Sequence, residues 1–128
     1  ADAYLQDPGD VGLGFWIATG RADGKGRRKF VWVDYTGTVK DFEMPYSLGD
    51  GSVVRVRHRL VLHGISESLL MSGDSGSPAV RTQSGKQLMG MYIAGKASNA
   101  YVLPAWQLFN PRNLSVGNEL SWGVATTP

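Results

Sequence analysis

The segment VVRVRHRLVLH, residues 53–63, shows the clearest alternation of polar and apolar side chains in this chain of 128 residues. Side chains two positions apart point to the same face of an extended chain. His58 therefore falls with the apolar residues, whereas His63 falls with the arginines. The two faces are Arg55, Arg57 and Arg59 on one side and Val54, Val56, Leu60 and Leu62 on the other. This alternation predicts a long strand with one buried face.

Six other short runs rich in β-branched and aromatic residues also indicate strands, and glycine and proline turns separate them. They span residues 14–20, 30–36, 38–44, 79–82, 87–94 and 100–103, and Gly37 separates the second run from the third. Pro104 opens a predicted helical turn that continues through residues 105–109, because proline favours the first position of a helix. The pattern fits a barrel or a sandwich. At this length we predict an all-β fold, a single antiparallel β-barrel with one short C-terminal helical turn.

The organisation along the chain predicts three parts. Residues 1–12 are polar and contain Pro8, Gly9 and Gly12, so we expect an N-terminal arm there. The barrel itself is expected to span residues 13–110. Residues 111–128 lack periodicity, which predicts an irregular C-terminal tail with a candidate edge strand at residues 120–124.

Composition excludes several classes of protein. The chain has no cysteine, which rules out disulfides and thiolate metal sites. It has only two histidines, and we expect no metal and no cofactor. No apolar run approaches 18 residues, so no membrane-spanning segment is expected, and the amino end lacks the features of a signal peptide. A net charge of +2 argues neither for nor against a nucleic-acid partner.

The segment SGDSGSP, residues 72–78, carries the chemistry. Gly73 and Gly76 have no side chains, so the backbone can turn tightly and push the Ser75 hydroxyl outward. In such a turn, the N–H groups of Gly73 and Ser75 can converge on an oxyanion. The segment differs from the Gly-x-Ser-x-Gly nucleophile elbow, because Ser77 stands two positions after Ser75.

A serine nucleophile needs an adjacent base, normally a histidine held by a carboxylate. The two histidines, His58 and His63, precede Ser75 by 17 and 12 positions. Because His58 is in phase with the valines and leucines, we expect it in the core. His63 ends the strand and is expected at the surface, nearer the turn that carries Ser75 (residues 72–78, the serine turn). Both remain candidate bases.

From Gly14 to about Phe109, the chain resembles the second, carboxy-terminal barrel of the chymotrypsin-like serine peptidases. The resemblance rests on several pieces in order. They are Thr19-Gly20, the arginine-rich strand, residues 73–78, the Gly90–Gly95 segment, and residues 100–104 followed by Trp106 and Phe109.

This resemblance implies roles for individual residues. Ser75 would be the nucleophile, the amides of Gly73 and Ser75 would form the oxyanion hole, and Asp74 would be the buried carboxylate that shapes it. Candidate partners for Asp74 are Arg57, Arg59 or a new amino terminus. The implied substrate pocket is formed by Leu69, Leu70, Met71, Gly95 and Asn99. Since Leu69 lies where trypsin-like members have an acidic residue, an apolar or small side chain before the scissile bond is implied.

The resemblance also implies a first barrel with a histidine and an aspartate, and these 128 residues do not contain it. Three explanations stay open. A second chain or an upstream segment supplies that barrel; or the barrel is non-catalytic and binds or supports a partner; or His58 or His63 acts as the base. For an unpaired barrel we predict an exposed apolar patch formed by Phe15, Trp16, Met44 or Trp122.

A second class of function comes from the basic residues. Five of them cluster in residues 21–29 and three lie on one strand face, near Trp16, Trp32 and Tyr35. Such a surface can contact phosphates and stack bases. Since the chain also has 11 carboxylates, a solvated charged face is the favoured interpretation, and nucleic acid is the alternative.

Overall fold

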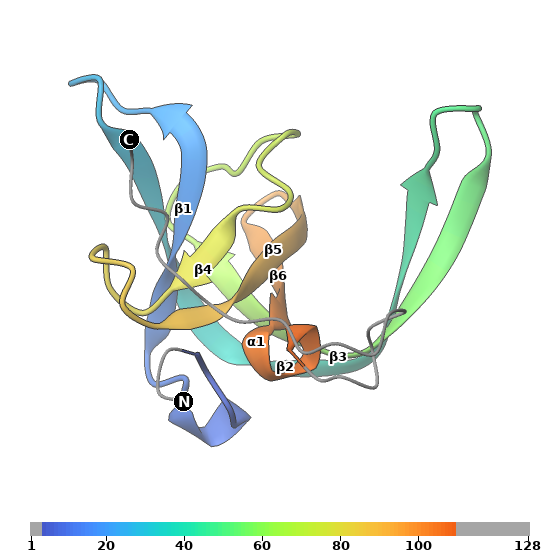
Figure 1. The fold of residues 1–128 in the computed structure, drawn as a ribbon, viewed down its shortest axis with the longest axis horizontal. Helices are drawn as coiled ribbons and strands as arrows, with labels where there is room; N and C mark the ends of the chain where they lie inside the picture. Colours follow the sequence, from blue (N-terminus) through green and yellow to red (C-terminus); the bar gives the residue numbers. More distant parts are fainter. Residues whose placement is uncertain (1–3, 110–128) are drawn as a thin grey trace.

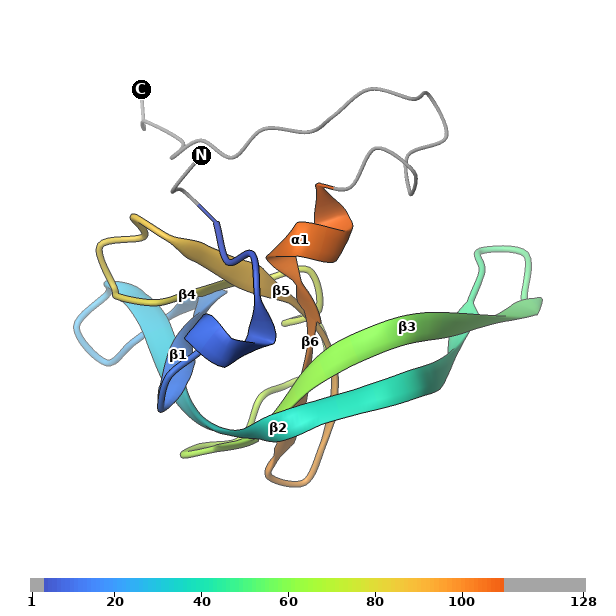
Figure 2. The ribbon, with the colours of Figure 1, turned by 90° about the horizontal axis from the view of Figure 1, so that it is seen from below.

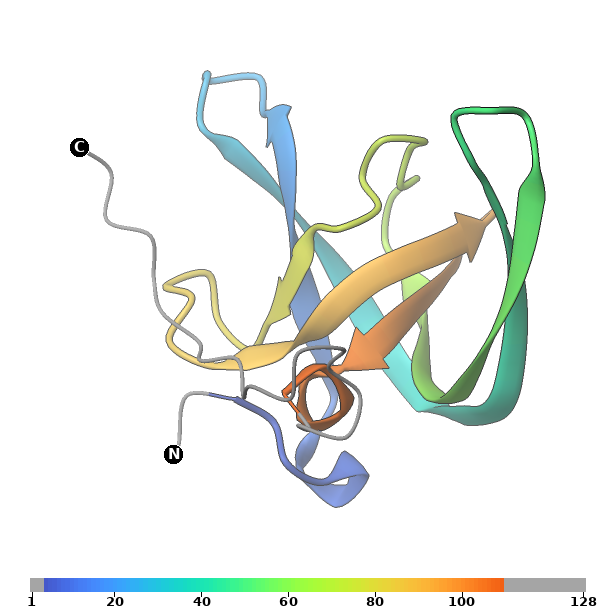
Figure 3. The same cartoon turned by 45° about the vertical axis from the view of Figure 1, so that its right-hand side comes forward.

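The computed structural model describes residues 4–109, which form a closed ring of six antiparallel strands (Figure 1). The order around the ring is β1-β2-β3-β6-β5-β4, and the short β4 lies between β1 and β5 (Figure 3). The strands are β1 (Gly14–Ala22), β2 (Arg28–Ser47), β3 (Val53–Ser66), β4 (Pro78–Val80), β5 (Leu88–Lys96) and β6 (Asn99–Pro104). A single turn of helix, α1 (Ala105–Leu108), follows β6. The predicted all-β antiparallel fold with one short helical turn is confirmed.

The core of the ring is formed by inward-facing residues of every strand. Along β3 the arginines of residues 53–59 are exposed and alternate with half-buried residues, as the sequence predicts. The predicted buried face is incomplete, because Val54 is exposed near the tip of the hairpin, and Val61, in phase with the arginines, is fully buried. The buried cluster comprises Phe15, Ile17, Val31, Val33, Leu62, Ala79, Leu88, Met89, Tyr92, Ala100, Val102, Ala105 and Phe109, together with Leu5 and Val11. Close packing of these side chains fixes where the loop between β3 and β4 leaves the ring.

The long β2–β3 hairpin extends beyond the ring (Figure 2). Its two strands keep one register from Gly37 and His63 to Ser47 and Val53, and the pairing is interrupted at Asp41, which adopts φ +53°. The predicted break at Gly37 is therefore wrong, since β2 is one strand of 20 residues. Gly37 adopts φ +133° beside a shift in register after Tyr35. Glycine tolerates that conformation, so the chain forms a bulge instead of ending the strand.

The arm before β1 packs on the ring, which the sequence did not predict. It contains a short 3₁₀ helix, η1 (Pro8–Asp10), whose first turn is capped by Asp7. Leu5 and Val11 are fully buried. The ring of Tyr4 lies 4.7 Å from that of Phe109, between centroids. The arm therefore covers part of the core.

The described residues of the predicted exposed apolar patch are not exposed as expected. Phe15 is fully buried in the core, because strand alternation turns it inward. Trp16 is partly buried and packs edge-on against Trp32, with ring centroids 5.1 Å apart. Met44 is half-buried on the hairpin, and Trp122 lies outside the described residues, as do the predicted tail and its edge strand. Among residues 4–109 there is no helix long and apolar enough to cross a bilayer.

Candidate active site

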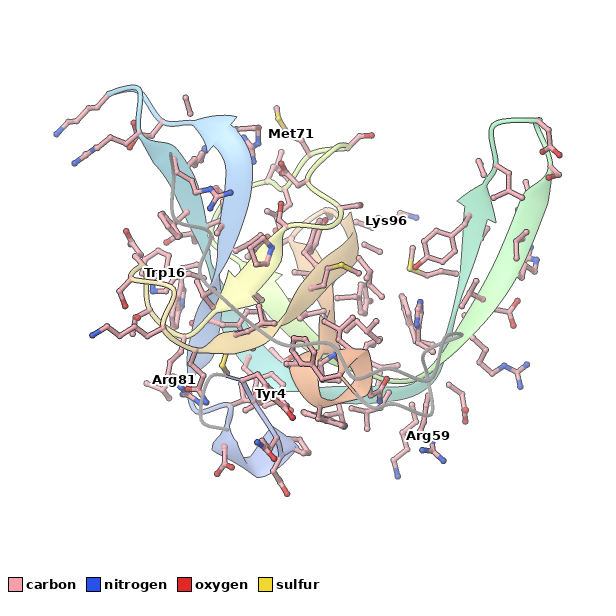
Figure 4. The ribbon with its side chains drawn as sticks, in the orientation of Figure 1. Tyr4, Trp16, Arg59, Met71, Arg81 and Lys96 are labelled. Carbon is pink, nitrogen blue, oxygen red and sulfur yellow. The ribbon has the colours of Figure 1, made fainter. Side chains whose placement is uncertain are left out.

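The serine turn connects β3 to β4 and has the tight geometry that its glycines predict. Gly73 and Gly76 adopt φ values of +100° and +92°, which side-chain-bearing residues rarely adopt. Two hydrogen bonds close the turn: the Asp74 amide donates to the Met71 carbonyl at 3.0 Å, and the Ser77 amide donates to the Asp74 carbonyl at 3.0 Å. Met71 directly precedes this turn in Figure 4.

Strand β5 anchors the turn to the ring. The Gly76 amide donates to the Tyr92 carbonyl at 2.8 Å, and the Tyr92 amide donates to the Ser77 carbonyl at 2.9 Å. These two bonds hold the residues after the serine as an extension of the sheet. The position of Ser75 is consequently set by the ring.

Ser75 is exposed, and its hydroxyl donates a hydrogen bond of 3.3 Å to the Ile93 carbonyl on β5. Within residues 4–109, no hydrogen bond uses the amide of Gly73 or Ser75. The turn thus presents a hydroxyl and two N–H donors at the surface of the protein. This is the donor set that acyl transfer to a serine requires.

Asp74 is buried beneath this turn, with 2% of its surface exposed. Its carboxylate accepts two hydrogen bonds from the Arg21 guanidinium, from Nε at 3.0 Å and from Nη2 at 2.9 Å. It also accepts one from the Met71 amide at 2.7 Å. The expected partners Arg57 and Arg59 are wrong, because both lie on the exposed face of the hairpin, where Arg57 pairs with Glu43 at 3.6 Å.

The ion pair is charged at neutral pH. Burial by itself would raise the pKa of Asp74, but the Arg21 hydrogen bonds, the Met71 amide and the charges of Arg21 and Lys29 together lower it below its usual value. The hydrogen bond to Asp74 raises the pKa of Arg21. Arg21 is the partner of Asp74 that sequence reasoning missed. The only local signal was its place directly after the Thr19-Gly20 turn.

The two histidines form hydrogen bonds with residues outside the serine turn. His63 lies between Thr36 and Asn99: its Nδ1 is 2.7 Å from the Thr36 hydroxyl, and its Nε2 is 2.8 Å from Asn99 Oδ1. His58 lies on the hairpin, with Nε2 3.1 Å from the Tyr46 hydroxyl, and burial lowers its pKa. In the part of the chain that the structure describes, neither histidine hydrogen-bonds to Ser75. Their role as a base stays a prediction.

The predicted pocket residues lie directly before the serine turn and at the adjacent ends of β5 and β6. Leu69 and Met71 are 67% and 56% exposed, whereas Leu70 packs against the core. Gly95 and Asn99 lie in the β5–β6 hairpin, beside Lys96 (Figure 4). The structure therefore brings the serine turn and this hairpin together through β5, which carries both Tyr92 and Gly95.

Tyr92 is a further residue at this site that the sequence did not single out. Its side chain is buried, and its hydroxyl lies so close to Gly95 that a Cβ at that position would overlap it. Burial raises the pKa of Tyr92, and the negative charge of Asp74 adds to the effect. The phenol thus lies against Gly95 and limits the room for a side chain at that position.

A hollow of about 450 Å³ opens at the end of the β1–β2 hairpin. The described residues that line it are Asp23, Arg27, Arg28, Lys29, Phe30 and Gln83. None of them belongs to the serine turn, so this hollow is separate from the predicted substrate pocket. Its described lining includes three cations and one carboxylate.

No protein-family model matches this chain, and no curated protein matches it. Among solved structures, it is similar to an inactive mutant of the murine norovirus NS6 protease, in forms that carry C-terminal extensions into NS7. Three such structures have identities of 13, 12 and 16% and TM-scores of 0.46, 0.49 and 0.44. They cover 80, 98 and 82% of this chain, and this chain spans 53, 61 and 59% of theirs. At these values no functional property is transferred.

Proposed function

We propose that this chain is the nucleophile-bearing half of a chymotrypsin-like serine endopeptidase that acts on a polypeptide. One observation carries the proposal. Ser75 is exposed on a turn whose two glycines have positive φ and whose aspartate is buried in an ion pair. Burying a charged carboxylate is costly unless it has a partner. An ordinary solvated turn would therefore leave its aspartate exposed to water.

The proposed reaction is acyl transfer in two steps. Ser75 Oγ attacks the peptide carbonyl and forms a C–O bond while its proton passes to a histidine. The N–H groups of Gly73 and Ser75 donate to the resulting oxyanion. The C–N bond then breaks, the histidine returns the proton to the leaving amine, and water hydrolyses the acyl-enzyme by the same route.

We place the required base outside the described residues. His63 has both ring nitrogens within hydrogen-bond distance of Thr36 and Asn99, and His58 is paired with Tyr46. A second chain or an upstream barrel carrying a histidine and an aspartate is therefore the proposed partner. The exposed Leu69 and Met71 offer apolar surface beside Ser75 for that partner or for the substrate.

Labelling with a fluorophosphonate, read by mass spectrometry, tests the proposal. We expect Ser75 to be labelled when the barrel is combined with the segment that supplies the histidine, and Ser75→Ala to abolish labelling. Labelling of this chain alone that disappears in His63→Ala or His58→Ala would instead assign the base to that histidine. No labelling in either sample would contradict an active serine nucleophile.

A non-catalytic binding module is the second candidate function. It is favoured by the basic β1–β2 hairpin, where Lys25, Arg27 and Arg28 are exposed and the two arginines line the hollow. Phosphate contacts by such residues weaken steeply with salt. A fluorescent single-stranded oligonucleotide tests this: tight binding that weakens steeply between about 50 and 200 mM salt, and that is lost in Arg27→Gln but kept in Ser75→Ala, would favour this candidate.

A further inference from the structure

The partner of Asp74 comes from a strand far away in the sequence. Arg21 lies 53 positions before Asp74, at the end of β1, and only the closure of the ring brings the two together. The guanidinium contacts both carboxylate oxygens. A planar, two-point contact of this kind fixes direction as well as charge.

Arg21 is itself held in place by an irregularity in β1. The pairing of β1 with β2 shifts register between Ala18 and Ala22, so the intervening residues depart from the regular ladder. Thr19, which is fully buried, fills this gap: its hydroxyl donates to the Lys29 carbonyl at 2.7 Å and accepts from the Arg21 amide at 3.3 Å. Such bulges commonly redirect a side chain.

We infer that Arg21 is the positioning residue of the serine turn, aimed at Asp74 by the Thr19 bulge, so that the turn is set within this barrel alone. Any effect of Arg21 on catalysis rests on the proposed function, whereas its role in positioning the turn does not. The Asp74 carboxylate links Arg21 to the Met71 amide, and Met71 in turn accepts from the Asp74 amide. Neither a cleaved amino terminus nor a second chain is needed to form this network.

Loss of the guanidinium should disturb the turn in a predictable way. An unpaired buried carboxylate either takes up a proton or rotates toward water. The Met71 amide then has a weaker acceptor in the first case and none in the second, so the turn that carries Gly73 and Ser75 is held less firmly. Lysine cannot replace the contact fully, because an ammonium group is a point charge without the planar fork.

The test compares Arg21→Gln with Arg27→Gln in the full chain by ¹⁵N–¹H NMR. Arg27 lies on the same hairpin and loses the same charge, but its side chain is exposed and pairs with Asp23. We expect Arg21→Gln to shift the amide signals of Gly73, Ser75 and Gly76, and Arg27→Gln to leave them unchanged. Unchanged turn signals in a folded Arg21→Gln variant would overturn the inference.

Two further measurements keep the inference testable if Arg21→Gln fails to fold. In Arg21→Lys we expect displaced turn signals, because an ammonium group cannot make the two-point contact; native signals in this variant would overturn that contact. The second is a titration of the Ser75 amide from pH 4 to 7. The titratable groups around Asp74 are Arg21, Lys29 and Tyr92. We expect the transition to lie at higher pH in Arg21→Lys than in the wild type, because the ammonium makes fewer hydrogen bonds to the carboxylate; two identical curves would overturn the role of Arg21.

The chemical consequence is measured separately. Where Ser75 reacts with a fluorophosphonate, we expect Arg21→Gln to slow labelling on the order of 10²-fold, the size of losing an oxyanion donor. If wild-type Ser75 does not react but the turn signals respond to Arg21→Gln, the proposed peptidase function fails and the positioning role stands. If Ser75 reacts equally fast in both proteins, the positioning role fails and the peptidase function stands.

Discussion

Phe42 stacks on Tyr101, with ring centroids 4.5 Å apart and an interplanar angle of 23°. The first residue lies on the part of the β2–β3 hairpin that leaves the ring, and the second lies on β6. Tyr101 also stacks on His63, at 5.0 Å between centroids. The three rings join the base of the hairpin to the wall of the ring.

Phe42→Ala should loosen the hairpin selectively. An aromatic pair contributes about 0.5–1.5 kcal/mol beyond the area it buries. We expect faster amide hydrogen exchange in residues 38–47 and 53–61, with little change in β1 and β5. Phe42→Tyr, which keeps the ring, serves as the control. Equal acceleration throughout the molecule would show that the stack supports the whole fold and not the hairpin.

Leu5→Ala tests whether the arm belongs to the core. Leu5 is fully buried, so its truncation should cost about 2–5 kcal/mol in the free energy of unfolding, measured with urea. Leu13→Ala removes the same atoms from a side chain that is 87% exposed, and we expect less than about 0.5 kcal/mol. Similar values for both variants would contradict a packed arm.

Gly90→Ala should destabilise the ring where β5 meets β6. A Cβ at Gly90 would overlap the Leu103 carbonyl and approach Val102 Cγ1 within 2.7 Å. Overpacking of this kind costs about 1–3 kcal/mol. Gly20→Ala is the matched control, since nothing lies within 4 Å of a Cβ there. Thermal unfolding of the two variants gives the comparison, and an equal Tm would contradict the close approach of the two strands.

Acid should weaken the fold through Asp74. The folded-state pKa of Asp74 is lowered, so the unfolded chain binds more protons between that value and about 3.9, the unperturbed aspartate pKa. Stability from the ion pair is therefore present above about pH 3.9 and lost as pH falls through the folded pKa. We expect Asp74→Asn to flatten the pH dependence of urea unfolding between about pH 2 and 5; an unchanged pH dependence in this variant would contradict the prediction.

His58 gives a second pH effect, confined to the hairpin. Burial lowers its pKa in the folded protein, so protonation favours the unfolded hairpin. The hairpin stability that comes from neutral His58 is present above about pH 6.5, the unperturbed histidine pKa, and is lost as pH falls through the pKa of the folded state. An NMR titration should place the His58 midpoint below about 6.5. Protection factors, which correct for the intrinsic pH dependence of amide exchange, should depend on pH in the wild-type hairpin and lose that dependence in His58→Gln; a persistent dependence would assign it to another group.

The features that the sequence predicts correctly are local ones. The alternation at residues 53–63 identifies β3 because strand periodicity is visible in neighbouring residues. Gly73 and Gly76 predict the turn around Ser75 because positive φ is a property of single residues. Proline at 104 likewise marks where α1 begins.

The features it does not predict depend on closure of the ring. Nothing near Asp74 in the sequence indicates Arg21, because the two meet only after β1 and the serine turn are placed on the same wall. Leu5 and Val11 are separated by a proline and a glycine, so they show no periodicity although both are buried. Gly37 predicts a break, but pairing with β3 continues past it.

The hairpin beyond the ring also has two open edges. Residues 38–47 and 53–61 pair only with each other among the described residues. An open strand edge can recruit another strand and start aggregation, and proline and charged residues discourage this. Pro45 has no N–H to offer, and Glu43 lies between Arg55 and Arg57 in an exposed cluster of charges. The same charges that suggested a nucleic-acid surface thus help to keep copies of this protein apart.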